Sequence, residues 1–353
     1  MKNENHKNSS ESLSSIPSHK ILSFMRSLSS STIEDENKNI VTINDWLEYW
    51  LANFCTNLKK NTFLYYSQTA HIHISRVLGD IKLIDLTNED IQLFINSLYL
   101  GVGIPEPLSP KSIKNVHGIL HKALSIAVLH KYIDENPANH IILPKITKSD
   151  IRVFSNAELQ TFLSAIKNHE KELLFIVALF TGMRQGELIG LTWDCINFEE
   201  GSIYLYRQLV KDRETKNYKF TTLKNNKSRK LFPAKLIMKM LYELKKKSFS
   251  ENNFVFISPR TKSHYTAPAV YNSYKKIVTK IGIPEMRYHD LRHTYAVLSL
   301  QAGDDIKTLQ NNLGHYSSAF TLDVYAHYTS DMQYISSNKM SDFISANFPE
   351  LNF

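Results

Sequence analysis

The sequence predicts a mainly α-helical protein of two domains, with a small antiparallel β-sheet near the start of the second domain. Its 353 residues are sufficient for two domains of about 100–200 residues each. Apolar residues recur at helical spacing through residues 42–145 and through most of the chain after residue 155, whereas alternating strand patterns are confined to residues 202–233. A polar stretch at 146–154 is typical of a linker between the two regions.

Residues 1–41 are rich in Ser, Asn, Lys and Glu, which is typical of a flexible lead-in. They contain no apolar signal core, and no apolar run in the chain approaches the about 20 residues that span a bilayer. The two cysteines, Cys55 and Cys195, are too few for a disulfide framework and suit a reducing compartment. We therefore expect a soluble protein of the cytoplasm with no membrane partner.

The first domain is expected to be a bundle of four helices. The segment TINDWLEYWLANF places its large apolar residues on one helical stripe. A second helix through NTFLYYSQTAHIHISRVL should end at Gly79, and a third should begin after the capping residue Thr87 and end at Gly101. Ser109 as N-cap and Pro110 at the first helical position predict the start of the fourth helix.

The second domain, residues 155–330, should begin with a helix whose SNAE start has the spacing of a capping box. A buried helix in KELLFIVALFTGM should end near Gly182. The strand SIYLYRQLV follows, and then two further strands joined by a polar turn at Asn225 and Asn226. The rest is helical, and residues 331–353 form a separate tail helix.

Basic side chains are concentrated in the second domain. Residues 151–353 carry 27 basic and 19 acidic side chains, which accounts for the whole net charge of +8, and residues 207–247 alone carry 14 against 3. Such a block is typical of contact with a nucleic-acid backbone. On charge alone, a solvated surface hairpin and helix is an equal alternative.

Three stretches of the second domain contain the candidate catalytic side chains: TGMRQGELIGLTW with Arg184, YHDLRHTYA with His289 and Arg292, and LGHYSSAFTLDVYAHY with His315 and Tyr325. Taken singly, each side chain is more simply a structural residue. A lone arginine pairs with a nearby glutamate, and a lone histidine is usually hydrogen bonded within the fold.

A zinc site is a further alternative, because His289 and His293 lie four positions apart, which is the ligand spacing of a zinc-binding helix. The residue after the first histidine, Asp290, is one methylene shorter than the usual general base of such helices. Arg292 would also hold a positive charge beside the metal. We therefore predict no metal.

Taken together, the three stretches fit phosphodiester cleavage by a tyrosine. A neutral phenol is a poor nucleophile, so a base is needed nearby. The transition state gains negative charge on the phosphate oxygens, which the planar guanidinium of arginine can bind two at a time. A lysine or histidine can protonate the departing sugar oxygen. With two arginines present, no metal or other cofactor is needed to neutralise charge.

These stretches resemble the three sequence boxes of the tyrosine recombinases, which include phage and conjugative-transposon integrases. TGMRQGELIGLTWDCI is similar to their first arginine box, HDLRHTYA to their H-x-L-R-H-T box, and LGHYSSAFTLDVYAHY to the box that joins L-G-H to the nucleophile. The resemblance is specific in the catalytic region and weaker in the helical region before it. It implies a SAM-like core-binding domain followed by a tyrosine-recombinase catalytic domain, and it is closest to the integrases of Gram-positive phages and conjugative elements.

The resemblance also implies the catalytic roles. Arg184 and Arg292 would bind the non-bridging phosphate oxygens, His289 would act as general base or proton relay, and His315 would hydrogen bond the same phosphate. Lys224 in TLKNNKSRK would protonate the leaving 5′ oxygen, with Lys227 as the alternative, because Asn225 stands where the family has threonine. Glu187 would support the first arginine box.

The nucleophile implied by the resemblance is Tyr325. It lies ten positions after His315 and begins the Y-x-H sequence that often contains the family's nucleophile. Tyr328 is three residues further, close to the same helical face, and is the second choice. Tyr316 is adjacent to the histidine and would point elsewhere.

The implied reaction forms a 3′-phosphotyrosyl link, frees a 5′ hydroxyl, and is reversed by a 5′ hydroxyl from a partner duplex, without ATP or metal. It would integrate or excise a mobile element. The implied partners are double-stranded DNA with inverted half-sites, a homotetramer on DNA at synapsis, and an excision helper protein as an optional component. The tail helix 331–353 would dock on a neighbouring protomer or pack on its own domain. Candidate DNA contacts are basic residues in both domains: Lys59, Lys60, Lys111, Lys114, Lys227 and Arg229.

Two other functions compete with recombination. A DNA-relaxing enzyme like the type IB topoisomerases would use similar chemistry without paired sites or a partner duplex. A non-catalytic DNA-binding protein would have no need for this set of arginines, histidines and a tyrosine together. The L-G-H box and the helical first domain favour recombination.

Overall fold

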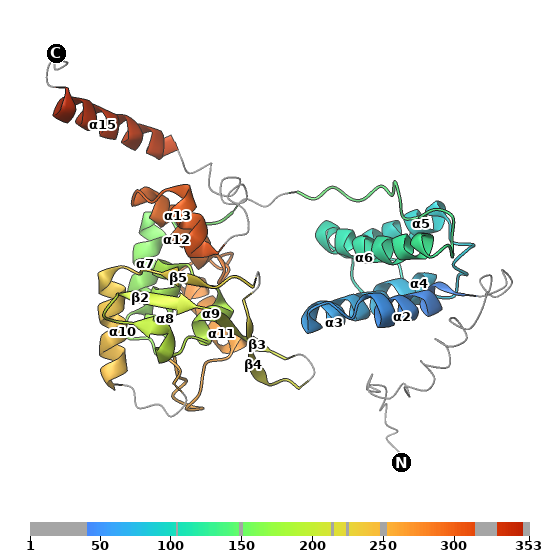
Figure 1. The fold of residues 1–353 in the computed structure, drawn as a ribbon, viewed down its shortest axis with the longest axis horizontal. Helices are drawn as coiled ribbons and strands as arrows, with labels where there is room; N and C mark the ends of the chain where they lie inside the picture. Colours follow the sequence, from blue (N-terminus) through green and yellow to red (C-terminus); the bar gives the residue numbers. More distant parts are fainter. Residues whose placement is uncertain are drawn as a thin grey trace. The chain divides into compact units, whose positions relative to one another are not determined.

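The computed structural model describes residues 41–103, 105–147, 151–212, 215–223, 226–247, 253–314 and 330–348. The chain divides into two compact units, Met1–Lys148 and Ser149–Phe353 (Figure 1). Both units are mainly helical, and strands occur among the described residues only in the second unit, so the predicted fold class is confirmed. No helix within these described ranges has the length and apolar character needed to cross a membrane.

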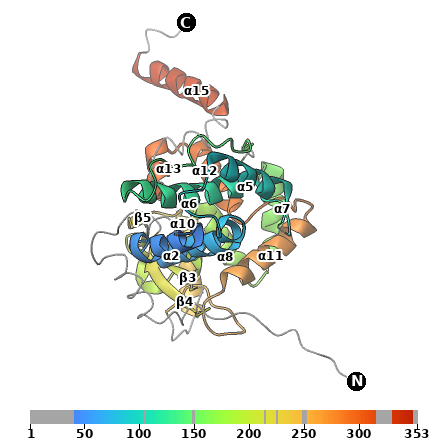
Figure 2. The same ribbon diagram turned by 90° about the vertical axis from the view of Figure 1, so that its right-hand side faces the viewer.

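The first unit is a helical bundle in which α6 contacts α2, α3 and α5, and α5 and α6 lie over α2 in both views (Figures 1 and 2). Its elements are α2 (Ile43–Phe54), α3 (Lys60–Thr69), the π-helix η2 (Ala70–Ser75), α4 (Arg76–Leu78), α5 (Asn88–Leu100) and α6 (Pro110–Leu129). The predicted caps are confirmed at Thr87, which caps α5, and at Ser109, which accepts from the Ser112 backbone N–H at the start of α6. Gly101 ends α5 in the left-handed conformation, as the glycine there predicts.

The second helix differs from its prediction in one respect. It runs from Lys60 to Leu78 and ends at Gly79 as expected, but residues 70–75 form a π-helix instead of continuing as α-helix. A Cβ at position 79 would lie 2.2 Å from the Ser75 backbone oxygen, so only glycine fits this helix end. The core of the unit consists of buried aromatic and aliphatic side chains that include Trp46, Phe94 and Ile91.

The second unit packs helices around a central buried helix, α8. Its helices are α7 (Asn156–Ile166), α8 (Glu172–Thr181), α9 (Gln185–Ile189), the 3-10 helix η3 (Trp193–Cys195), α10 (Lys235–Lys247), α11 (Ala267–Lys280), α12 (Asp290–Gln301), α13 (Ile306–Leu313) and α15 (Ser330–Asn347). Contacts join α8 to α7, α9, α10 and α12. The apolar core gathers around Phe162, Phe175 and Tyr274.

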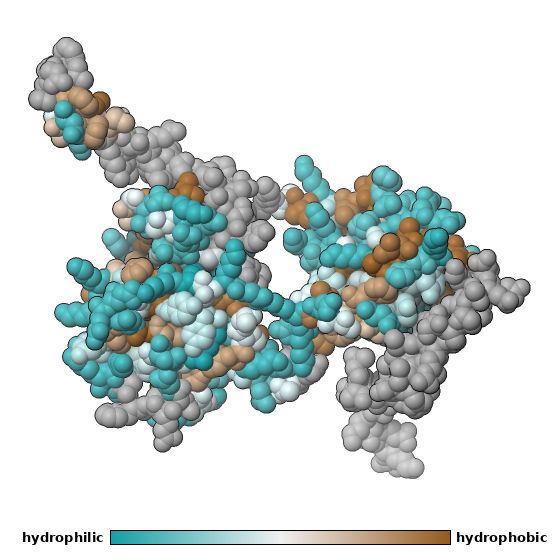
Figure 3. All heavy atoms as spheres, viewed as in Figure 1, coloured by the Kyte–Doolittle hydropathy of each residue, from teal (hydrophilic) through white to brown (hydrophobic). Residues whose placement is uncertain are grey.

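The strands form two antiparallel sheets where the sequence predicted one. They are β1 (Ile196–Asn197), β2 (Ser202–Leu205), β3 (Arg207–Lys211), β4 (Tyr218–Thr222) and β5 (Arg229–Leu231), in the orders β1-β2-β5 and β3-β4. The predicted continuous strand SIYLYRQLV breaks at Tyr206, because β2 pairs with β5 (Leu205 opposite Arg229) while β3 pairs with β4 (Arg207 opposite Thr222). The face of this unit that is turned to the viewer in Figure 3 is largely hydrophilic.

Candidate active site

The first arginine of the site is placed by a tight turn after α8. Gly182 ends α8 with φ +61°, and a Cβ there would lie 2.4 Å from Tyr295 Cδ1, so the position requires glycine. Two residues later, Arg184 is the N-cap of α9. The TGMR sequence therefore ends one helix, reverses the chain and presents the arginine at the start of the next helix.

Glu187 in the first turn of α9 holds this arginine in place. The backbone N–H of Arg184 donates to Glu187 Oε2 at 2.9 Å, and Arg184 Nη1 donates to Glu187 Oε1 at 3.0 Å. The side chain of Glu187 is fully buried, whereas that of Arg184 is 21% exposed. The side chain of Arg184 therefore keeps some exposure to solvent, unlike that of Glu187.

The second arginine, Arg292, lies on α12 and bridges two turns of the fold. It is 3% exposed. Its Nη1 donates to the Gly182 backbone oxygen at 2.5 Å, and its Nη2 donates to the backbone oxygen of Leu313. Arg292 thereby joins the end of α8 to the end of α13, and its burial is offset by hydrogen bonds at both ends of the guanidinium.

Both arginines meet at the C-terminal turn of α13. Arg184 Nη2 donates to the Gly314 backbone oxygen at 3.0 Å, next to the Leu313 oxygen that accepts from Arg292. Gly314 caps α13 with φ +62°. Two guanidinium groups from stretches more than 100 residues apart therefore bind adjacent carbonyls of one turn. This is the convergence of cations that phosphate chemistry requires.

His289 lies at the N-cap of α12, close to both arginines. Partial burial lowers the pKa of the ring, and the positive charges of Arg292 and Arg184 lower it further, against the opposite effect of Asp290. The side chain keeps an exposed face. The imidazole is therefore neutral at neutral pH, and the negative charge of a bound phosphate would offset the two cations and make the ring a better proton acceptor.

His293, the second histidine of the zinc alternative, lies with its ring centroid 5.0 Å from that of His289 in an edge-to-face arrangement. Burial and the neighbouring His289 lower its pKa to about 4. Among the residues that the structure describes, no group of three or more His, Cys, Asp or Glu side chains is placed to hold a metal ion.

Arg229 departs from its expected role as a surface DNA contact. It lies on β5 with its side chain only 8% exposed. Its Nη1 and Nη2 donate to Glu187 Oε1 and Oε2 at 2.9 and 2.6 Å, and its Nε donates to the Asn312 backbone oxygen at 2.9 Å. Strand alternation contains a signal for this, because Arg229 shares a face with buried Leu231 while exposed Lys230 points the other way.

The charges around Glu187 explain its titration. Burial acts to raise the pKa of its carboxyl group, but the ion pair with Arg229 and the contacts with Arg184 outweigh burial and lower it to about 2. The carboxylate therefore stays charged throughout the neutral range. The carboxylate neutralises the charge of Arg229, with which it forms the bidentate pair, and it orients Arg184.

Three of the predicted catalytic residues, Lys224, His315 and Tyr325, lie outside the described residues. The nearest described residues are Leu223 before Lys224 and Asn226 after it. The Asn226 backbone N–H donates to the Leu223 oxygen at 3.0 Å, and Lys227 is exposed on this turn. Their roles, and the choice of Tyr325 over Tyr328, stay predictions.

The four lysines expected to contact DNA in the first unit are exposed at the starts of two helices. Lys59 and Lys60 begin α3, and Lys111 and Lys114 lie in the first turn of α6. Helix N-termini favour phosphate groups, and the contact of these lysines with DNA stays a prediction.

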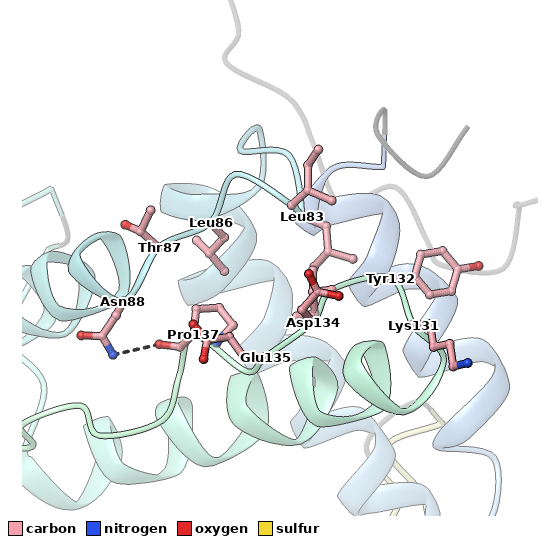
Figure 4. A pocket seen from close by; sticks show the side chains of 11 residues that line it. Leu83, Leu86, Thr87, Asn88, Lys131, Tyr132, Asp134, Glu135 and Pro137 are labelled. Atoms are coloured by element: carbon pink, nitrogen blue, oxygen red, sulfur yellow. Dashed lines mark hydrogen bonds between the residues drawn. The ribbon is translucent and has the colours of Figure 1, made fainter. Parts of the chain in front are cut away.

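A cavity of about 700 Å³ opens elsewhere in the first unit (Figure 4). A hydrogen bond from Asn88 Nδ2 to the Pro137 oxygen, 3.1 Å long, crosses one side of it. Its lining includes Leu83, Tyr132 and Glu135 and none of the predicted site residues. The described residues of the candidate active site form a polar cluster at converging turns, separate from this cavity.

Comparison with known proteins gives matches to both units. Residues 152–332 match the model of the phage integrase family, and residues 42–99 match that of the phage integrase N-terminal SAM-like domain. A tyrosine recombinase XerC-like protein of Caldanaerobacter subterraneus subsp. tengcongensis is 29% identical over 317 residues, which are 81% of this chain and 79% of that protein. The ICEBs1 integrase of Bacillus subtilis is 26% identical over 318 residues, 84% of this chain and 82% of that protein.

Among solved structures, the Tn1549 transposon integrase in complex with a circular intermediate DNA superposes with a TM-score of 0.74. The superposition covers 85% of this chain and 99% of the Tn1549 chain at 21% sequence identity. The fold of the two proteins is the same.

Proposed function

This chain belongs to the phage integrase family of tyrosine recombinases, and we propose that Tyr325 is the residue with which it cleaves and rejoins DNA. The observation that carries the proposal is the meeting of Arg184 and Arg292 at the Leu313–Gly314 turn. This turn directly precedes His315 and begins the stretch that contains Tyr325. The proposal places the scissile phosphate next to this turn, where both arginines can bind it.

In the proposed reaction, the phenolic oxygen of Tyr325 attacks the scissile phosphorus and the bond from phosphorus to the 5′ oxygen breaks. The phenolic proton passes to His289, whose lowered pKa keeps the ring neutral and able to accept it. Lys224 gives a proton to the departing 5′ oxygen, and Lys227 is the alternative donor. The product is a 3′-phosphotyrosyl link, which retains the energy of the phosphodiester bond for rejoining.

The two arginines stabilise the charge that develops on the non-bridging oxygens. Without DNA, their N–H groups bind the backbone oxygens of residues 182, 313 and 314. These backbone acceptors are neutral, and the Glu187 carboxylate that also holds Arg184 is paired with Arg229. Because the guanidinium groups are already held in place, little reorganisation is needed when phosphate arrives. His315 would add a further hydrogen bond to the same phosphate.

The proposed substrate is double-stranded DNA with inverted half-sites at the end of a mobile element. The Tn1549 integrase is known in complex with a circular intermediate DNA, and the lambda integrase as a tetramer bound to a Holliday junction. By analogy, we propose that four copies of this chain act at synapsis, with a helper protein as an optional partner in excision. The cytoplasm is the proposed compartment. Lys59, Lys60, Lys111 and Lys114 are the proposed backbone contacts of the first unit.

The tail helix is a proposed contact between protomers. In α15, Met340 and Phe343 are 59% and 55% exposed, and Phe348 just after it is 43% exposed. Three large apolar side chains exposed within nine residues are more typical of a docking surface than of a solvated helix. Packing on the chain's own catalytic domain is the alternative.

The test is covalent capture on a nicked suicide duplex. The duplex carries the junction sequence obtained by sequencing across both ends of the element that encodes the chain, and a nick beside the crossover lets the short 5′-hydroxyl strand diffuse away after cleavage. The wild-type protein should form a covalent adduct, Tyr325→Phe should form none, and Tyr328→Phe should form as much as the wild type.

An adduct that persists in Tyr325→Phe and disappears in Tyr328→Phe would move the nucleophile to Tyr328. Relaxation of supercoiled plasmid that lacks the junction would favour the DNA-relaxing alternative. Specific DNA binding by the wild type without any adduct would leave only a binding protein.

A further inference from the structure

A buried ion pair between Arg229 and Glu187 connects three parts of the active site that are far apart in the sequence. Glu187 belongs to α9 and holds Arg184. Arg229 follows the turn that carries the candidate lysines and lies in β5, opposite Leu205 of β2. Its Nε also donates to the Asn312 oxygen at the end of α13. Arg229 therefore follows the lysine turn in the chain and is in contact with both the first arginine box and the end of α13.

The hydrogen bonds of the Glu187 carboxylate are divided evenly between the two arginines. Oε1 accepts from Nη1 of Arg184 and Nη1 of Arg229, and Oε2 accepts from the Arg184 backbone N–H and Nη2 of Arg229. Arg229 thus forms the bidentate pair, whereas Arg184 commits a single guanidinium nitrogen to the carboxylate. The other end of the Arg184 guanidinium turns toward the Gly314 oxygen.

This division has a consequence for the charge of Arg184. A fully buried carboxylate that lost Arg229 would have one cation left within reach, and the bidentate geometry is the stronger one for an arginine and a carboxylate. Arg184 would be drawn fully onto Glu187, and its charge and N–H groups would be withdrawn from the phosphate. Because Arg229 occupies the bidentate position, Arg184 is oriented by Glu187 and keeps its charge for the substrate.

The same side chain supports the turn before His315. Gly314 lies against Arg229, since a Cβ at position 314 would be 3.1 Å from both Cδ and Nη1 of that arginine. The positive φ of Gly314 and the bond from Arg229 Nε to the Asn312 oxygen set the direction in which the chain leaves α13. A shorter side chain at position 229 would leave this turn without its support.

We propose that Arg229 is a positioning residue for strand cleavage: it holds Glu187 so that Arg184 stays available to the phosphate. The proposal rests on the proposed function, because it needs Arg184 to bind the scissile phosphate. It assigns to Arg229 a role inside the protein and no direct contact with DNA.

The first experiment compares rates of covalent adduct formation on the nicked suicide duplex. Arg229→Met keeps much of the side-chain length without charge, and its rate should fall by about 10²- to 10³-fold, as for the loss of a transition-state hydrogen-bond donor. Affinity for the duplex should stay close to that of the wild type. Arg229→Lys, which restores the charge but not the fork, should recover part of the rate.

The matched control is Lys230→Met. It removes a cation from the neighbouring residue of the same strand, where the side chain is exposed and pairs with Glu200. Its cleavage rate should equal that of the wild type. If Arg229→Met fails to fold by circular dichroism, Arg229→Lys carries the comparison, because it keeps a cation beside Glu187.

The second experiment separates positioning from general damage to the structure. A duplex with a methylphosphonate at the scissile position has no negative charge there, so it gains little from the Arg184 cation. If Arg229 acts through Arg184, the ratio of wild-type to Arg229→Met rates should fall from about 10²–10³ towards one on this duplex. A defect of equal size on both duplexes, or a variant as fast as the wild type on the natural duplex, would overturn the proposal. A wild-type protein that forms no adduct on the natural duplex would instead overturn the proposed function.

Discussion

Among the described residues, the first unit buries polar side chains that are uncharged, whereas the second unit buries full charges. Ser67, Thr69 and Asn136 are the buried polar side chains of the described part of the first unit. In the second unit, Glu187, Asp290 and Arg292 are each no more than 3% exposed. Burying a charge costs several kcal/mol that an apolar residue would not. The difference indicates that the first unit is built for stability and the second for an electrostatic task.

The buried charges of the second unit are compensated by short-range partners at a few turns. Asp290 accepts from the backbone N–H and the guanidinium of Arg287, at 2.7 and 2.8 Å. Glu187 accepts from two arginines, and Arg292 donates to carbonyls of two helix ends. This network holds the two site arginines in a fixed geometry before DNA arrives. Its hydrogen bonds and ion pairs offset the cost of burying the charges.

The largest expected effect concerns the core of the first unit. Trp46 is 1% exposed, and its Nε1 donates to the Ala123 oxygen at 2.9 Å. Trp46→Ala should lower the free energy of unfolding of this unit by about 3–5 kcal/mol, measured by urea denaturation. Leu93→Ala, at a site 60% exposed on the same bundle, should change it by less than about 0.5 kcal/mol. Equal losses in the two variants would contradict the assignment of the core.

The next effect concerns Arg292 and should appear in activity. Arg292→Ala leaves the oxygens of Gly182 and Leu313 without their donor and removes one phosphate ligand. The rate of covalent adduct formation should fall by about 10²- to 10³-fold, or about 2.7–4 kcal/mol in transition-state stabilisation. Lys280→Ala, which removes an exposed cation at the end of α11, is the control and should keep the wild-type rate. A normal rate in Arg292→Ala would remove this residue from the site.

The third effect is a loss of stability in acid that Glu187 contributes to the second unit. The pKa of Glu187 falls from its ordinary value of 4.5 to about 2 on folding. A group whose folded pKa is lowered contributes stability above its unfolded pKa and loses it as the pH falls towards the folded value. The contribution of Glu187 is about 3 kcal/mol at neutral pH and should disappear between pH 4.5 and about 2.

Urea denaturation at several pH values in that window checks this prediction. Glu187→Gln should make the stability of the second unit less dependent on pH there, while the first unit keeps its own dependence. If the variant and the wild type lose stability in parallel, the charge of Glu187 is not compensated in the way described.

Prediction from sequence succeeded where the determinant is local and failed where it is tertiary. The caps at Thr87, Ser109 and Gly182 follow from side chains or φ values within a few residues of each helix end. The break at Tyr206 does not, because it depends on which distant strands pair with its two sides. The π-helix at residues 70–75 could not be predicted either, because the spacing of apolar residues does not distinguish one π-helical turn from α-helix.

The site was predictable to a similar degree. Family boxes pointed to Arg184, His289 and Arg292, and the structure places these three together. The basic composition around Arg229 suggested a surface contact and concealed the strand alternation that puts this residue inside. The carbonyl oxygens that receive the two arginines could not be predicted, because backbone acceptors have no signature in the sequence.

The smallest expected effect concerns the surface of the first unit. Lys114 is exposed in the first turn of α6. Lys114→Ala should weaken binding about equally for all DNA sequences and reduce the slope of log affinity against log salt by about 1. Lys82→Ala, which removes an exposed lysine outside the helices, should leave the slope unchanged. The reverse result would show that a different face of the first unit contacts DNA.

The proposal that Tyr325 is the nucleophile is tested most directly by identifying the residue that becomes joined to DNA. The covalent adduct formed on the suicide duplex can be digested with nuclease and trypsin, and the modified peptide sequenced by mass spectrometry. We expect a nucleotide joined through its 3′ phosphate to the phenolic oxygen of Tyr325, in the stretch that follows the turn where Arg184 and Arg292 meet. A nucleotide attached to Tyr328, Tyr316 or any residue outside that stretch would contradict it.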